Sequence, residues 1–276
     1  MKIFNGMIEM KIYQQMDFLF LLLCLILLPI QITHAATQPP VPVGRVVWIK
    51  GNLKAIMENK EERTLQNKSI IYLHDTLVTD ASSKAQVGFT DQTMMTFREN
   101  TTFKIDKYQY NPGSKSSGAK SAMSLVEGGF RTITGAISKN APNNYEVNTP
   151  VATIGVRGTE YQTYHQGETT YIGFYNGTPC IRLRQQTCDD YKRRFPEKAK
   201  QIDEENKNKK GDKVICLNKQ VRWVKVVGPC GNPEPMDEKP DAIKDDLEIN
   251  QTYIEPFNFG GGVGGGKGGT NDFCIQ

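Results

Sequence analysis

The sequence is poor in histidine, with three in 276 residues, and it contains no Cys-x-x-Cys pair. Zinc sites are built from closely spaced cysteine and histidine ligands, so this scarcity argues against zinc. A catalytic hydroxyl needs a neighbouring base, and no Ser-His-Asp set is evident. We therefore expect no catalytic residue and no metal site.

A complete phosphate-binding loop is also absent. Residues 260–270 read GGGVGGGKGGT and come close to the Walker pattern, but Gly268 follows the lysine where the pattern needs Ser or Thr. We interpret this stretch as a flexible linker and expect no cofactor. The formal charge of +4 is only mildly basic and gives no reason to expect a nucleic-acid partner.

The longest apolar run is short for a membrane span. Residues 18–32 read FLFLLLCLILLPIQI, about 15 residues where a span needs about 20. Lys2 and Lys11 precede the run and Ala35 follows it, which is the pattern of a secretory signal peptide. We expect cleavage after Ala35 and a periplasmic or secreted product. The alternative is an uncleaved inner-membrane anchor, which would be the one membrane contact.

The central region, residues 43–177, reads as β-strands. Ala85, Val87 and Phe89 alternate with polar residues, a turn follows, and the alternation resumes at Met95. Such strands recur about every 8 residues, and helical periodicity is not convincing over any window of about 11 residues. The pattern predicts an all-β fold, either a meander, a sandwich or a solenoid.

Several segments of this region resemble the FecR domain, the periplasmic module of iron-dicitrate sensor regulators and of many other exported bacterial proteins. In order they are GRVVWIKGN, HDTLVTDASSKAQVGFTDQTMMTFRENTTFKI, LVEGGFRTITG, YEVNTPVATIGVRGTEYQTY and TTYIGFYNG. The resemblance covers residues 43–177. It implies a non-enzymatic, signalling or binding module whose partner is an envelope protein or a cell-surface polymer.

The resemblance to sensor-type FecR proteins implies a cytoplasmic anti-sigma segment, then one transmembrane helix, and then this domain. Here 17 residues precede the apolar run, too few to fold as a unit that grips a sigma factor. We therefore do not expect the family's role in gene control to carry over.

The stretch NTPVATIGVRGTEY, residues 148–161, is the most specific part of the resemblance. We interpret it as a structural corner, because proline suits a strand edge, glycines allow a bend and a buried arginine would bond free carbonyls. The alternative is a small-ligand sensor in which Arg157 grips an anion. The motif residues are Thr149, Pro150, Gly155, Arg157, Gly158, Thr159 and Tyr161.

After the binding or signalling module and the small-ligand sensor, an envelope hydrolase is the third functional hypothesis. A glycan hydrolase needs two carboxylates at a cleft. Asp75, Asp91 and Glu160 are candidates, but nothing in the sequence marks two of them as a pair.

Beyond residue 177 the composition changes. Residues 178–232 contain the stretch PEKAKQIDEEN, which predicts a short helix opened by Pro196, and two strands that predict a hairpin around Asn218-Lys219. We expect a disulfide-linked α+β appendage, because an exported protein meets oxidising conditions. Three connectivities are open for the four cysteines, which are Cys180, Cys188, Cys216 and Cys230.

The expected domain boundaries follow from these readings. We expect a signal peptide over residues 1–35, a linker over 36–42, and the FecR-like domain over 43–177. The cysteine-bracketed appendage spans 178–232. Residues 233–276 are acidic and then glycine-rich, and we expect them to form a disordered tail.

Overall fold

A computed structural model of the chain describes residues 39–112, 118–176, 180–183, 188–189, 192–193, 196–206, 214–216, 222–228, 230–231, 233–243 and 247–249. The chain divides into two compact units, Met1–Pro39 and Pro40–Gln276, and the described residues from Pro40 onward belong to the second. Within the described ranges, no helix is both long enough and apolar enough to cross a membrane. The signal peptide predicted over residues 1–35 lies outside these ranges.

The second unit is built from β-strands, as predicted, and the 17 strands found in its described ranges form one continuous sheet. Neighbouring strands run antiparallel except for β9 and β10, which are parallel. The helical segments include α2 (Ala136–Asn140), the 3-10 turn η1 (Pro142–Asn144) and α4 (Pro196–Asn206), and residues 188–189 and 192–193 are helical as well. The strands are β1 (Pro42–Lys50), β2 (Leu53–Ile56), β3 (Glu62–Thr64), β4 (Ile70–Tyr72), β5 (Thr76–Thr79), β6 (Lys84–Phe89), β7 (Met94–Phe97), β8 (Thr102–Gln109), β9 (Lys120–Ile133), β10 (Tyr145–Asn148), β11 (Ala152–Gly155), β12 (Glu160–Gln166), β13 (Thr169–Asn176), β14 (Cys180–Leu183), β15 (Val214–Cys216), β16 (Trp223–Val227) and β17 (Glu234–Met236).

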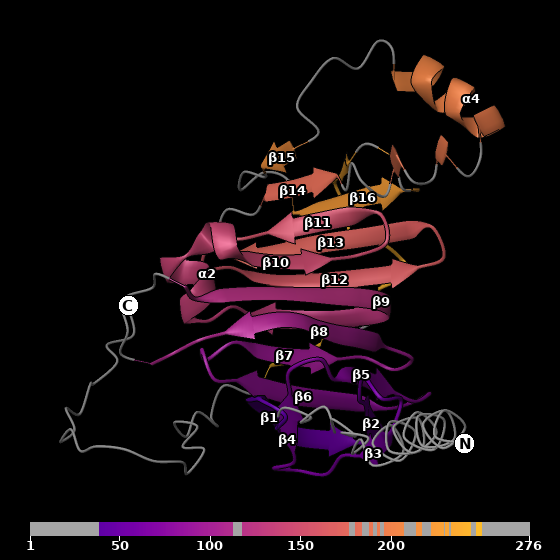
Figure 1. Cartoon of the computed structure of the whole chain (residues 1–276). Helices are drawn as coiled ribbons and strands as arrows, with labels where there is room; N and C mark the ends of the chain where they lie inside the picture. Colours follow the sequence, from indigo (N-terminus) through magenta and orange to yellow (C-terminus); the bar gives the residue numbers. More distant parts are fainter. Residues whose placement is uncertain are drawn as a thin grey trace, which may run out of the picture. The chain divides into compact units, whose positions relative to one another are not determined.

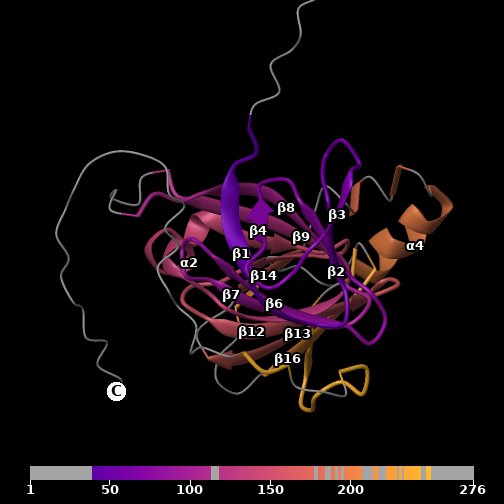
Figure 2. The same cartoon turned by 90° about the horizontal axis from the view of Figure 1, so that it is seen from below.

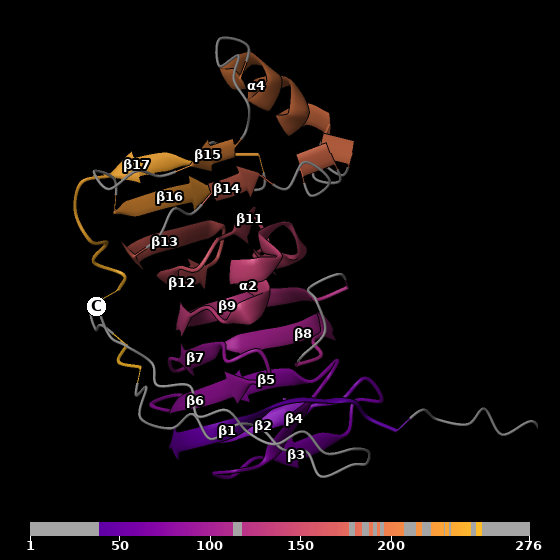
Figure 3. The same cartoon turned by 90° about the vertical axis from the view of Figure 1, so that its left-hand side faces the viewer.

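The sheet is folded into two layers that share strand β9. Layer A has the order β4-β1-β6-β7-β9-β12-β13-β16-β17. Layer B has the order β3-β2-β5-β8-β9-β10-β11-β14-β15. Figures 1 and 3 show the strands stacked one above another, and Figure 2 looks along the stack. The chain therefore passes repeatedly from one layer to the other.

The hydrophobic core lies between the layers, because alternate residues of each strand point to the same face. The predicted core positions Ala85, Val87 and Phe89 are all 0% exposed, although Gln86 between them is buried too. Aromatic rings join the layers: Phe103 of layer B lies 5.0 Å from Phe97 and 5.3 Å from Phe130 of layer A, measured between ring centroids.

Strand β9 changes layers at Gly128. Residues 120–127 pair with β8 in layer B, whereas residues 128–133 pair with β12 in layer A. The φ angle of Gly128 is +83°, and a Cβ there would lie 2.5 Å from the Asn100 carbonyl oxygen and 2.5 Å from the Thr101 Cα. Both the backbone angle and the close approach of the neighbouring chain therefore require glycine.

The described part of the expected disordered tail is ordered. We call residues 233–243 and 247–249 the C-terminal strap. β17 pairs with β16, Ile243 and Leu247 are each 1% exposed, and Figure 3 shows the chain running on from β17 along the side of the stack. The Leu247 carbonyl accepts a hydrogen bond from Arg131 Nη1 at 2.8 Å.

The boundary predicted at residue 233 is therefore wrong for the strap. The composition of the strap is mainly acidic, but its Ile243 and Leu247 side chains are buried against the domain and its strand β17 pairs with β16. Residues 251–276 lie outside the described ranges.

The appendage is confirmed in part. Helix α4 covers the predicted stretch, and a disulfide joins Cys188 to Cys230. The predicted hairpin is wrong, because β15 pairs with β14 in layer B while β16 pairs with β13 and β17 in layer A. Each of its two strands extends a different layer.

We predict that Gly128→Ala lowers the free energy of unfolding by about 3 kcal/mol, because it adds a close contact to the strain of a positive φ. Gly167→Ala is the matched control: Gly167 has a φ of +59° but open space around its Cβ position, so we expect a loss of about 1 kcal/mol. Urea denaturation measures both. Equal losses in the two variants would contradict the close approach at the β9 bend.

We predict that Leu247→Ala lowers the free energy of unfolding by about 2–3 kcal/mol, because it removes a buried side chain of the strap. Val126, which is 50% exposed, provides the control, and Val126→Ala is expected to stay within about 0.5 kcal/mol of the wild type. A strap that detaches in solution would make the two variants equally stable.

We predict a second disulfide between Cys180 and Cys216. These residues are direct partners in the antiparallel pair β14–β15, where Cα atoms lie about 4.5–5.5 Å apart, within the range that a disulfide spans. Mass spectrometry of non-reduced peptides decides the point. Free thiols at both positions in protein recovered from an oxidising compartment would refute it.

Candidate functional site

The distinctive motif forms a tight hairpin and then a crossing between layers. β10 and β11 pair in layer B, with Asn148 opposite Thr153, and exposed Pro150 lies in the turn between them. Thr149 closes this turn: its amide donates to the Ala152 carbonyl at 2.8 Å, and its hydroxyl accepts from the Ala152 amide at 3.0 Å. Gly155 ends β11, and the chain then crosses to β12 in layer A.

Hydroxyl groups hold the crossing itself. The Thr159 amide donates to the Thr134 hydroxyl at 2.9 Å. The Gly158 amide donates to the Ser138 hydroxyl at 2.9 Å, and that hydroxyl donates to the Val156 carbonyl at 3.1 Å. These bonds satisfy backbone groups that have no partner strand at this point.

Arg157 is exposed, so the prediction of a buried guanidinium at this corner is wrong. The carbonyls that the guanidinium was expected to bond have other partners. The Arg157 carbonyl accepts from the Thr159 hydroxyl at 3.2 Å, and the Thr159 carbonyl accepts from the Thr134 amide at 3.1 Å. Tyr161, the last residue of the motif, is fully buried, with its hydroxyl 3.3 Å from that of Tyr145.

The three candidate carboxylates serve separate structural contacts. Asp75 pairs with Arg63 at 2.5 Å, and Glu160 pairs with Arg131 at 2.6 Å. Asp91 is buried and has its own set of hydrogen-bond donors, described next. None of these contacts brings two of the three candidate carboxylates to a common cleft, which is the arrangement that a glycoside hydrolase uses.

Asp91 joins the β6–β7 turn to helix α2. Its carboxylate accepts from the Tyr108 hydroxyl at 2.9 Å, from the Thr93 hydroxyl at 3.0 Å and from the Ile137 amide at 3.3 Å. Its backbone carbonyl accepts from the Ala136 amide at 2.7 Å. Burial raises the pKa of Asp91, and the hydrogen bonds oppose part of that shift.

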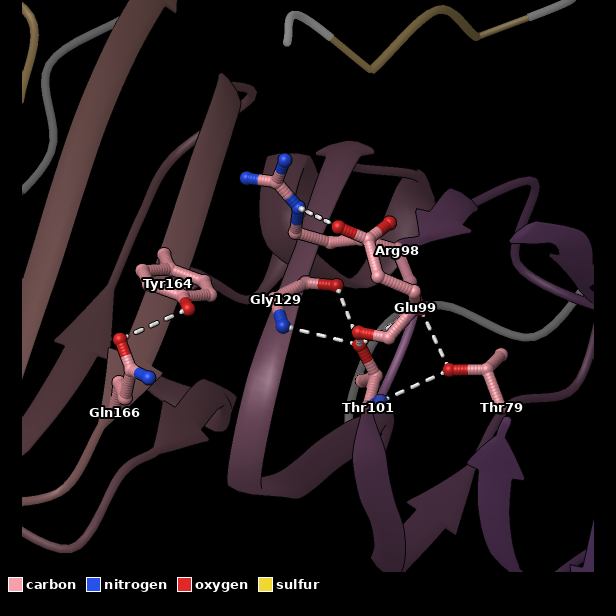
Figure 4. A network of polar contacts seen from close by, with 7 residues as sticks. All are labelled: Thr79, Arg98, Glu99, Thr101, Gly129, Tyr164 and Gln166. Carbon is pink, nitrogen blue, oxygen red and sulfur yellow. Dashed lines mark hydrogen bonds and ion pairs between the residues drawn. The ribbon is translucent and has the colours of Figure 1, made fainter. Parts of the chain in front are cut away.

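The other end of β9 and β12 carries a second set of hydroxyls, shown in Figure 4. Thr79 Oγ1 accepts from the Thr101 amide at 2.9 Å and donates to the Arg98 carbonyl at 2.6 Å. Thr101 Oγ1 accepts from the Gly129 amide at 3.0 Å. This network ties the β7–β8 crossing to the bend of β9.

A cavity of about 490 Å³ lies beside this network. Its lining comes from residues 98–100, from Glu127 and Gly128, from residues 164–166 and from Ala242 of the strap. Among these residues His165 is 3% exposed, and burial lowers its pKa, which favours the neutral ring.

Arg98 is the unusual residue of this cavity. Its side chain is 5% exposed, its Nη1 is buried without a hydrogen-bond partner, and its Nε lies 3.8 Å from Glu99 Oε1. The guanidinium carbon lies 5.4 Å from the centroid of the Tyr164 ring. Arg98 was not among the site residues predicted from the sequence, because the segment TFREN indicates only the end of a strand followed by a turn.

Within the described ranges, no group of three or more Asp, Glu, His or Cys side chains is placed to hold a metal ion. The polar groups near the motif thus act mainly on the backbone. Among the described residues, Arg63 Nε and Arg98 Nη1 are both buried without a hydrogen-bond partner, and of these two arginines Arg98 is the one that lines the cavity.

We predict that Asp91 makes the stability of the protein fall as the pH rises from about 4. A raised pKa means that the folded state binds more protons than the unfolded state above the ordinary value of 3.8, so the free energy of unfolding decreases with pH in that window. Asp91→Asn cannot titrate and is expected to flatten this slope. Urea denaturation from pH 3.5 to pH 7 measures it, and parallel curves for the two proteins would refute the assignment.

Comparisons with known proteins agree with the reading of the motif. Residues 75–178 match the family model described as FecR protein, and no curated protein matches the chain. Two crystal structures of a candidate anti-sigma factor from Parabacteroides distasonis ATCC 8503 are each 13% identical to this chain, with TM-scores of 0.40 and 0.39. The alignments cover 61% of this chain and 62% of those chains, less than two thirds of their length. The match over residues 75–178 confirms the resemblance seen in the sequence: these residues of the chain are similar to the FecR protein family.

Proposed function

We propose that the protein is a non-catalytic regulatory module of the bacterial cell envelope that binds an envelope protein or a cell-surface polymer through its β domain. The observation that carries the proposal is the FecR match over residues 75–178. The motif hydroxyls support it, because that of Thr149 bonds to the backbone of the β10–β11 turn and that of Thr159 to the backbone of the crossing. Thr149 also accepts from the Thr170 hydroxyl, so that Thr170 lies between it and His165. A reacting hydroxyl would instead need a base beside it.

The outer side of layer A offers the best candidate for the partner surface. Tyr175 is 40% exposed, its ring lies 4.0 Å from the Arg131 guanidinium carbon, and its hydroxyl donates to Gln162 at 2.9 Å. A tyrosine whose position is already fixed loses little entropy on binding, and exposed tyrosines are frequent anchors of interfaces.

Affinity capture tests this proposal. The tagged full chain is incubated with envelope extract of the native host, and bound proteins and polymers are identified after cross-linking. We expect one envelope component to be enriched, with capture reduced by Tyr175→Ala but not by Val126→Ala, which alters layer B. Equal capture by both variants would contradict the surface, and turnover of a glycan substrate would contradict the non-catalytic role.

Export of the protein is part of the same proposal. It rests on the sequence pattern of residues 1–35, which lie outside the described ranges. N-terminal sequencing of protein from the native host is expected to begin at Ala36. An intact N-terminus in the membrane fraction would support the anchored form instead.

The second candidate function is a small-ligand sensor. The sequence suggested Arg157 for this role. We infer that Arg98 is the better candidate, because it lines the cavity and its buried Nη1 has no hydrogen-bond partner.

A further inference from the structure

We propose that the cavity at Arg98 binds a small zwitterion, a molecule with a carboxylate and an ammonium group, such as a free amino acid. Its volume of about 490 Å³ lies within the range of small-molecule sites, about 300–1,000 Å³. The walls come from the β7–β8 crossing, the bend of β9 and the end of β12, and the strap adds Ala242. These elements fix the cavity in the folded chain.

Arg98 provides the end that binds the carboxylate. The nearest carboxylate oxygen, Glu99 Oε1, lies 3.8 Å from Nε, which is beyond a hydrogen bond, and Nη1 has no partner. A buried guanidinium without acceptors is unfavourable, and its planar fork matches the two oxygens of a carboxylate. Figure 4 shows the guanidinium directed away from the Thr79–Thr101 network, and the ring of Tyr164 supports it from one side.

The rim provides the end that binds the ammonium group. Glu99 and Glu127 line the cavity; Glu127 is exposed and Glu99 is 37% exposed in its side chain. With His165 neutral, these two carboxylates outnumber the single cation of Arg98. A phosphate or a simple carboxylate would add negative charge to a lining that is already negative, whereas a zwitterion places its ammonium group near the rim.

This site is distinct from the partner surface at Tyr175, so the two proposals are tested independently. Titration calorimetry of the full chain uses individual L-amino acids as probes, with acetate, D-glucuronate and inorganic phosphate for comparison. We expect at least one amino acid to bind, and each comparison anion to bind about tenfold more weakly or worse. Absence of amino-acid binding at millimolar concentration, or tighter binding of any comparison anion, would overturn the proposal.

Three variants test which residues bind the carboxylate and which bind the ammonium group of the ligand. Arg98→Lys keeps the charge but loses the planar fork, and we expect amino-acid affinity to fall about tenfold. Glu127→Gln is expected to weaken amino-acid binding about threefold without weakening acetate binding. Arg157→Ala removes an equal charge at an exposed position outside the cavity and is expected to leave affinity unchanged.

Glu127→Gln alters an exposed side chain, so it keeps the test valid if Arg98→Lys does not fold. Unchanged amino-acid affinity in Glu127→Gln would overturn the role of the rim. A loss in Arg157→Ala equal to that in Arg98→Lys would overturn the assignment of the site to this cavity.

Discussion

The crossings from β7 to β8 and from β11 to β12 leave backbone amides and carbonyls without a partner strand, and satisfying these groups is the constraint on which the two-layered structure depends. A buried backbone group without a hydrogen bond is costly, so nearly all such groups are paired in folded proteins. Here threonine and serine hydroxyls provide the pairing. Thr79 and Thr101 lie near the bend of β9, and Thr134, Ser138 and Thr159 lie near the start of β12, on the opposite side of the stack. Short hydroxyl side chains suit this role because they reach the backbone close to their own position.

Whether a polar group already has a hydrogen-bond partner distinguishes the groups that hold the fold from those available to a ligand. At the motif, the carbonyls of Val156, Arg157 and Thr159 each accept from a hydroxyl or an amide, and the Arg157 side chain is exposed. At the β7–β8 crossing, the backbone of Arg98 is also satisfied, but its guanidinium is not. The proposed ligand site therefore lies where the backbone network is complete and one buried charge remains.

Local patterns in the sequence were sufficient for the strands, for helix α4 and for the family. The alternation of Ala85, Val87 and Phe89 depends only on period two and on burial of one face, and Pro196 marks the start of its helix. Long-range pairing was not accessible in this way. No local signal shows that β9 belongs to both layers, or that β15 and β16 join different layers.

Burial that depends on distant strands also explains why the order of the strap and the exposure of the two arginines were not predicted. The acidic composition of the strap predicted disorder. The burial of Ile243 and Leu247 was not predicted, because it depends on a surface supplied by distant strands. Whether Arg98 or Arg157 is buried likewise depends on which crossing the neighbouring strands cover. The candidate cavity could therefore be found only after the layers were assembled.

The most direct test of this account is the stability of two variants at Thr101, whose hydroxyl bonds to the Gly129 amide at the bend of β9. Thr101→Val keeps the shape but removes the hydroxyl, and urea denaturation is expected to show a loss of about 2 kcal/mol or more in the free energy of unfolding. Thr101→Ser keeps the hydroxyl and is expected to lose no more than about 1 kcal/mol. A valine variant as stable as the serine variant would contradict the claim that hydroxyl groups hold the crossings between the layers.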